Sequence, residues 1–141
     1  MTDKEQLRWL LEQFMADSPG VTHVVVTSLD GLRLVTSASV DRDLGDSLSA
    51  LSAGLLSMAS RTSALLALGD CEYMTLRLAG GHLLLMRIDE ASGVIVAATP
   101  DADLRVVAYN MTHLFGSASH ALSPQLRTTP SVAGSPGPAG A

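Results

Sequence analysis

The sequence predicts a domain of the α/β type (α+β), built on one antiparallel sheet in the order α-β-β-α-β-β-β-α. Three observations predict this. Several short runs rich in Val, Leu and Ile are typical of strands. Consecutive runs are joined by short Gly-containing turns, which connect antiparallel neighbours. Three longer segments repeat their apolar residues at helical spacing. A single antiparallel sheet hides its faces under helices.

Composition supports one domain with a tail. The chain has 141 residues, of which 47% are hydrophobic and 16% charged. A body of about 120 residues buries roughly two-thirds of its unfolded surface, which argues against a disordered chain or a disulfide scaffold. We expect a domain over residues 1–124. Residues 125–141 are rich in Pro, Gly, Ser and Ala, and we expect them to be disordered.

The first three elements are marked by caps and turns. Thr2 and Glu5 form a capping box that opens a helix, and Ser18-Pro19-Gly20 ends it. Strands are predicted at 21–28 and 32–36, because Asp30-Gly31 between two apolar runs is a strong hairpin signal.

The remaining elements follow in the same way. A long helix is predicted over 44–68, with acidic residues at its start, where they suit the helix dipole. Strands are expected at 71–78, 82–88 and 94–99. Thr99 is expected to cap the last helix, with Pro100 at its first position.

The long helix has two different faces in projection. Its larger apolar residues fall near one line and are predicted to pack on the sheet: Leu44, Leu48, Leu51, Leu55, Met58, Thr62 and Leu66. The opposite face is small and nearly uncharged, which favours close contact with another polypeptide over a solvated surface. This predicted interface comprises Asp46, Ser49, Ala50, Ala53, Ser57, Ser60, Arg61 and Ala64. Asp46 and Arg61 could pair across it, or remain solvated charges.

Charge and motifs exclude several function classes. The net charge is −5 and the nine basic residues are scattered, so neither nucleic acid nor an anionic membrane surface is expected as a partner. No membrane-inserting segment is predicted, and we expect a cytoplasmic protein. There is no phosphate-binding P-loop and no hydrolase or zinc-protease motif.

Isolated His and Cys residues do not suggest catalysis. His23, His82, His113 and His120 have no convincing metal-ligand spacing, and Cys71 has no evident base beside it. We therefore expect no catalytic residues, no metal and no cofactor, and interpret the chain as a binding module. An enzyme using Cys71 or His82 is the least favoured alternative.

The ordered set of segments resembles the roadblock/dynein-light-chain family, in its bacterial branch encoded beside Ras-like small GTPases and histidine-kinase-like sensors. Three segments carry the resemblance, with Asp-Gly-Leu after the first strand and Pro-Asp-x-Asp-Leu before the last helix: residues 7–37, 48–60 and 99–115. Arg105 stands where relatives commonly have Gly, and Asn110 where Glu is common.

The resemblance implies a five-stranded antiparallel sheet, with the long helix on one face and the terminal helices on the other. It also implies a homodimer or heterodimer formed through the long helix and an adjacent strand edge. Members are non-enzymatic regulators or scaffolds of small GTPases, and one bacterial relative accelerates hydrolysis by its partner. Arg42 and Arg61 are the arginines that could be inserted into a GTPase site by position alone. The alternative is a small-molecule sensory domain with a pocket under the sheet.

Overall fold

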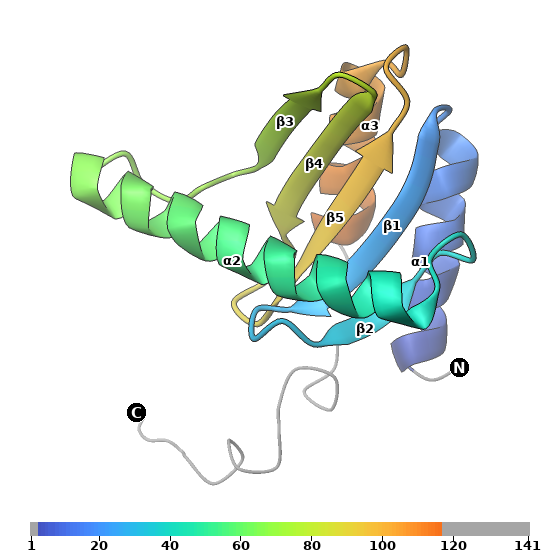
Figure 1. The fold of residues 1–141 in the computed structure, drawn as a ribbon, viewed down its shortest axis with the longest axis horizontal. Coiled ribbons are helices and arrows are strands. Elements are labelled where there is room, and N and C mark those ends of the chain that lie inside the picture. The colour runs from blue at the N-terminus through green and yellow to red at the C-terminus, as the bar shows by residue number, and fades with distance from the viewer. Residues whose placement is uncertain (1–2, 117–141) are drawn as a thin grey trace, which may run out of the picture.

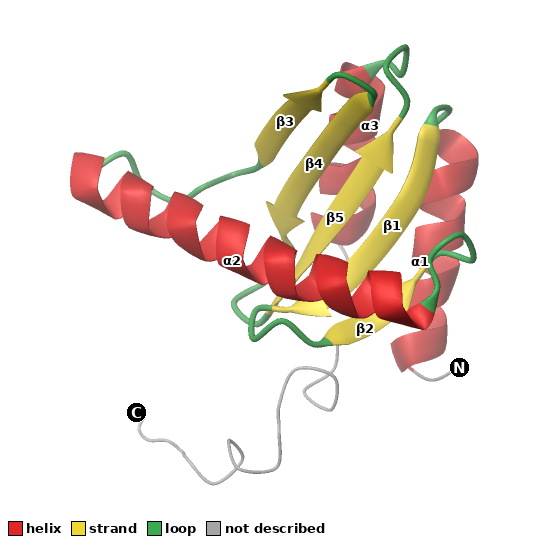
Figure 2. Ribbon diagram, in the orientation of Figure 1, coloured by secondary structure: helices red, strands yellow, loops and turns green. Residues whose placement is uncertain are grey.

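The computed structural model describes residues 3–116, which form a five-stranded sheet with helices on both faces (Figures 1 and 2). The element order and antiparallel topology are those predicted. The elements are α1 (Asp3–Asp17), β1 (Val21–Ser28), β2 (Arg33–Thr36), α2 (Arg42–Leu66), β3 (Met74–Leu78), β4 (Gly81–Arg87), β5 (Ser92–Ala98), α3 (Leu104–Asn110) and a π-helical turn η1 (Met111–Phe115).

The sheet has the strand order β2-β1-β5-β4-β3. Its centre is fixed by β5, which pairs with β1 on one side and β4 on the other. Ile95 is therefore in register with both Val25 and Leu85. The short strand β2 and the strand β3 form the two edges.

Side chains on the two faces of the sheet form separate hydrophobic cores, because alternate residues of a strand point to opposite faces. One core lies under α1, α3 and η1, where the Phe14 and Phe115 rings meet edge-on at 5.4 Å. The other lies under α2 and includes Val25, Leu56 and Ile95. This division confirms the long helix on one face and the terminal helices on the other.

The turns before β1 and before α3 lock together through Gly20. Its φ is +96°, and a Cβ there would lie 2.7 Å from the Ala102 Cβ. The Thr99 N–H donates to the Gly20 carbonyl at 2.8 Å. Only glycine combines this left-handed backbone with so close an approach.

The predicted start of the last helix is wrong by four residues. The N-cap is Asp103, whose side chain accepts from the Arg105 N–H. Thr99 instead uses its hydroxyl to bond Asp101 at 2.7 Å, within the preceding turn. The predicted Thr2 cap, the domain boundary at 124 and the tail over 125–141 lie outside the described residues.

Candidate functional site

The long helix α2 lies across one end of the sheet, and its second half extends past the sheet (Figure 1). Asp41 caps its N-terminus by accepting the Leu44 N–H at 2.8 Å. Ala67 ends it in the left-handed conformation, with φ at 55°. Residues 64–68 are exposed, so the final turn has little contact with the rest of the protomer.

The predicted core face of α2 is correct for Leu48 and Leu55, which pack against the core under α2, and wrong for most of its other members. Leu44, Leu51, Met58 and Leu66 of the predicted core stripe are 39%, 63%, 57% and 61% exposed. The residues buried against the sheet are mostly small: Gly45, Ser49, Ser52 and Leu56.

Small residues face inward because α2 lies close to the sheet, and in particular to its edge strand β2. A Cβ on Gly45 would come within 2.6 Å of the Arg33 Cδ. The Ser52 hydroxyl is satisfied by the Leu48 carbonyl of its own helix. Leu51, Met58 and Leu65 are consequently left on the outside, where the described part of the protomer does not cover them.

The predicted interface residues fall into three environments. Ser49 is fully buried against its own sheet, so it is not available to a partner. Ala53 and Ser60 are half-buried. The others are exposed: Asp46, Ala50, Ser57, Arg61 and Ala64.

Asp46 is already paired within the protomer. Its Oδ1 accepts from the Arg33 Nε at 2.9 Å, which ties α2 to β2. A contact between Asp46 and Arg61 across an interface would have to compete with this ion pair.

Exposed apolar side chains gather on the outward side of α2. We define the outer face of α2 by the exposed residues that recur at three- and four-residue spacing: Ser47, Leu51, Gly54, Met58, Arg61 and Leu65. Leu65 is 86% exposed, and Leu68 just beyond the helix is 73% exposed. Leu51, Met58 and Leu65 thus form a row of exposed apolar side chains along α2.

A groove runs beside the outer face, between the second half of α2 and β3. Its volume is about 430 Å³, and its lining is mainly apolar. It is lined by Leu55, Met58, Ala59, Thr62, Ser63, Leu68, Cys71 and Met74. Among the described strands, β3 pairs only with β4, so its other edge remains open. An exposed edge strand is a template for pairing with another chain.

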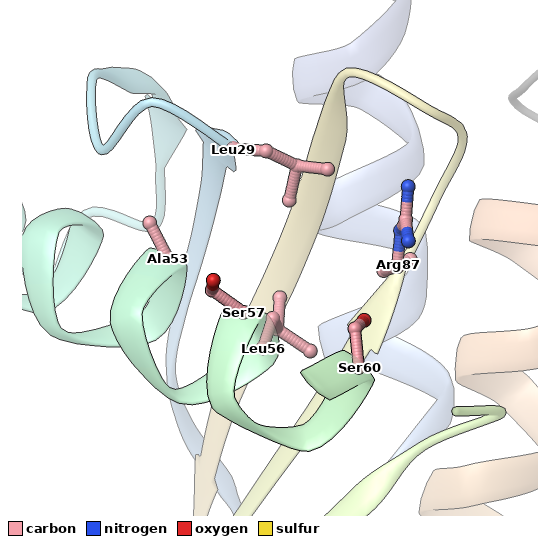
Figure 3. A pocket seen from close by; sticks show the side chains of 6 residues that line it. All are labelled: Leu29, Ala53, Leu56, Ser57, Ser60 and Arg87. Carbon is pink, nitrogen blue, oxygen red and sulfur yellow. The ribbon is translucent and has the colours of Figure 1, made fainter. Parts of the chain in front are cut away.

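A second cleft lies on the opposite flank of α2, where the helix passes the ends of β1 and β4 (Figure 3). Its volume is about 230 Å³. We call it the Arg87 cleft, and its lining is Leu29, Ala53, Leu56, Ser57, Ser60 and Arg87. Three of these, Ala53, Ser57 and Ser60, belong to the predicted interface. No sequence pattern associates them with Arg87, which lies 27 positions beyond Ser60.

The described histidines and Cys71 do not form a common metal site. His82 is buried, with Nε2 at 3.3 Å from the Pro100 carbonyl. His23 Nδ1 lies 2.7 Å from the Thr22 hydroxyl, and His113 stacks on Tyr109. His120 lies outside the described residues. Within residues 3–116, no three His, Cys, Asp or Glu residues are grouped as metal ligands, and no helix could span a membrane.

Of the two departures from the family pattern, Asn110 has a structural role. Its Nδ2 donates to the Asp17 carbonyl and the Ser18 Oγ, both at 3.0 Å, and so joins α3 to the end of α1. Arg105 is exposed, with its Nε at 4.0 Å from Asp103.

Comparison with known proteins gives consistent matches. The family model of the Roadblock/LC7 domain matches residues 7–98. A Roadblock/LC7 domain from Streptomyces avermitilis is 27% identical, with a TM-score of 0.77 over 82% of this chain and 96% of that one. MglB from Myxococcus xanthus is 12% identical, with a TM-score of 0.76 over 82% and 94% of the two chains.

The gliding protein MglB from Thermus thermophilus is 16% identical, with a TM-score of 0.73 over 89% and 92% of the two chains. At these identities the two MglB structures are evidence for the fold alone. Among the curated proteins, none matches the chain significantly.

Proposed function

The chain belongs to the Roadblock/LC7 family, and we propose that it is a non-enzymatic regulatory module that self-associates and binds a Ras-like small GTPase in the cytoplasm. A histidine-kinase-like sensor is a further proposed partner. The observation that carries the proposal is the outer face of α2, which presents large apolar side chains to water beside an open sheet edge.

The outer face of α2 is better suited to a second copy than to solvent. Leu51, Met58 and Leu65 are each more than half exposed in the protomer. Burying one such side chain contributes about 1.5–3 kcal/mol. Three from each of two protomers would offset a large part of the association cost of about 4–15 kcal/mol.

Gly54 supports a specific crossing point for two α2 helices. It lies in the middle of α2 and is exposed, and a Cβ there would meet nothing within 4 Å among the described residues of its own protomer. Glycine in a helix interior costs about 1 kcal/mol relative to Ala. A backbone approaching closely at Gly54 would explain a glycine that the protomer itself does not require.

Antiparallel crossing at Gly54 also brings opposite charges together. Positions equally distant from Gly54 would face each other, so Arg61 would lie across from Ser47 of the second copy, one helical turn from Asp43. Asp43 and Arg61 are both exposed. We propose that these residues pair between the two copies.

Self-association is tested by analytical ultracentrifugation of the full chain. We expect a dimer at micromolar concentration, and at least a hundredfold weakening by Met58→Glu. Val106→Glu is the matched control, since Val106 is an exposed apolar residue on α3, across the sheet. Asp43→Arg and Arg61→Asp should each weaken association, and their combination should restore it. A wild-type monomer at high concentration would contradict the proposal.

GTPase binding is tested with a Ras-like small GTPase from the same organism, loaded separately with GDP and with a non-hydrolysable GTP analogue. We expect binding at tens of micromolar or tighter, with a preference for one nucleotide state. GTP hydrolysis is followed in parallel samples loaded with GTP, because the proposed regulation includes a change in its rate. Absence of binding in both states would refute the GTPase role and leave self-association untouched.

A further inference from the structure

We propose that the Arg87 cleft receives an acidic side chain, a glutamate in the first instance, from the protein partner that docks along α2. This inference rests on the proposed partner-binding role, and it names the chemistry of one contact within it. The cleft shares no lining residue with the outer face of α2 or with the groove beside β3.

The polar groups of the Arg87 cleft are hydrogen-bond donors without strong partners of their own. Arg87 makes one hydrogen bond among the described residues, to the Glu90 carbonyl, at the long distance of 3.5 Å. In the same part of the chain the hydroxyls of Ser57 and Ser60 make none, whereas Ser52 and Thr62 of the same helix donate to its backbone carbonyls. A guanidinium and two hydroxyls therefore line the same opening.

The charge of the lining selects an anion. Arg87 is its sole charged residue, and no carboxylate belongs to the described lining. Arginine binds carboxylates through two parallel N–H donors, and such charge-assisted bonds are stronger than neutral ones. On a chain with a net charge of −5, Arg87 therefore gives this lining one positive charge.

The floor of the cleft is apolar and depends on Gly93. A Cβ at Gly93 would lie 2.9 Å from Leu56 Cδ1 and 3.6 Å from Leu29 Cδ2. The absence of a side chain on β5 at this point lets Leu56 and Leu29 close over the sheet. An aliphatic stem can pack on these leucines while its end group reaches Arg87.

The volume favours a side chain over a free ligand. Small-molecule sites commonly measure about 300–1,000 Å³, and this cleft measures about 230 Å³. Arginine also binds phosphate through its paired donors, but a phosphate has no aliphatic part to pack on Leu29 and Leu56, and no helix N-terminus adds donors here because Ser57 and Ser60 lie in the interior of α2. A methylene stem ending in a carboxylate fits the floor, the size and the donors together.

The first experiment is independent of the GTPase. Wild-type protein is titrated with N-acetyl-glutamate amide and with N-acetyl-glutamine amide, and NMR shifts are followed at Arg87 Nε–H, Ser57 and Ser60. We expect saturable shifts confined to the cleft with the glutamate compound, at least tenfold weaker binding of the glutamine compound, and loss of the shifts in Arg87→Gln. Equal response to both compounds, or an unchanged response in Arg87→Gln, would overturn the proposal.

Inorganic phosphate is titrated in parallel. Tighter binding of phosphate than of the glutamate compound would make the cleft a phosphate site and overturn the assignment.

The second experiment measures GTPase affinity and self-association of the same variants. Arg87→Gln should weaken GTPase binding about tenfold, reduce its salt dependence and leave self-association unchanged. The matched control is Arg77→Gln, which removes one exposed positive charge from β3, where Arg77 is in register with His82 on the face covered by α1 and α3.

Weakened self-association in Arg87→Gln would assign the cleft to the second copy instead and overturn the proposal. If wild-type protein binds no GTPase while the glutamate titration succeeds, the proposed partner fails and the chemistry of the cleft stands.

Discussion

The Nε of Arg33 donates a hydrogen bond to the Asp46 carboxylate at 2.9 Å, so the first half of α2 is tied to the edge strand β2. The Arg33 side chain is 32% exposed and that of Asp46 56%. Exposed pairs of this kind contribute about 0.2–1 kcal/mol. Asp46→Asn should therefore lower the free energy of unfolding by less than about 1 kcal/mol, measured by urea denaturation. A double-mutant cycle with Arg33→Gln isolates the pair, and a coupling near zero would contradict it.

Gly54 should give opposite effects on the protomer and on its assembly. Gly54→Ala removes a helix-breaking residue without a clash, so it should stabilise the protomer by up to about 1 kcal/mol. Gly54→Leu places a bulky side chain at the proposed crossing point and should weaken self-association at least tenfold. Both are measured on one sample series, by denaturation at low concentration and by ultracentrifugation. Unchanged association in Gly54→Leu would move the crossing point elsewhere.

Gly20 should tolerate no side chain. Its φ of +96° and the 2.7 Å approach to Ala102 act together in Gly20→Ala. The left-handed backbone alone costs about 1–2 kcal/mol, and the contact adds to it. We expect a loss of at least about 2 kcal/mol in the free energy of unfolding. Gly80→Ala is the control, because a Cβ at Gly80 meets nothing within 4 Å among the described residues.

Leu56 is the main aliphatic anchor of α2 on the sheet, at 3% exposure. Leu56→Ala should cost about 2–5 kcal/mol of stability. The same truncation opens the floor of the Arg87 cleft. Leu51→Ala is the matched control, since Leu51 is 63% exposed and its loss should barely change the stability of a dilute monomer. An equal loss of unfolding free energy in the two variants would mean that α2 is rotated about its axis relative to this structure.

Asp101 should titrate below an ordinary aspartate. The Thr99 hydroxyl, and secondarily a backbone hydrogen bond, lower the pKa of Asp101 from its ordinary value of 3.8. A carboxyl whose folded pKa is depressed contributes stability above the unfolded pKa, and this contribution is lost as the pH falls through the folded pKa. Thr99→Val should raise the Asp101 pKa, which is measured by carboxyl-carbon NMR across an acid titration. An unchanged pKa in Thr99→Val would remove the hydroxyl as its cause.

The fold could be predicted from the sequence because its signals are local. Asp30-Gly31 predicts the hairpin of β1 and β2, and short turns order the later strands. The rotation of α2 could not be predicted in this way. Helical periodicity places Leu51 and Met58 on one side and Ser49 and Ser52 on another, but it does not say which side meets the chain's own sheet. Because α2 packs closely on the sheet, mainly small residues fit on its inward side.

The candidate site shows the same limit. Ala53, Ser57 and Ser60 can be identified from the small side of α2, but Arg87 joins them only through the pairing of β4 in the sheet. Between α2 and β4 lie a connecting segment, the strand β3 and a turn. No spacing in the sequence predicts that residues so separated meet. The charged member of the cleft is therefore out of reach of pattern analysis.

The part of α2 that extends past the sheet links folding to concentration. In a lone protomer, the backbone amides near Leu65 are protected by little more than the hydrogen bonds of the helix itself. They should therefore exchange with deuterium rapidly. Once a second molecule lies against them, the same amides should become slow. The rate of deuterium uptake in these final turns would then report the fraction of the protein that is assembled.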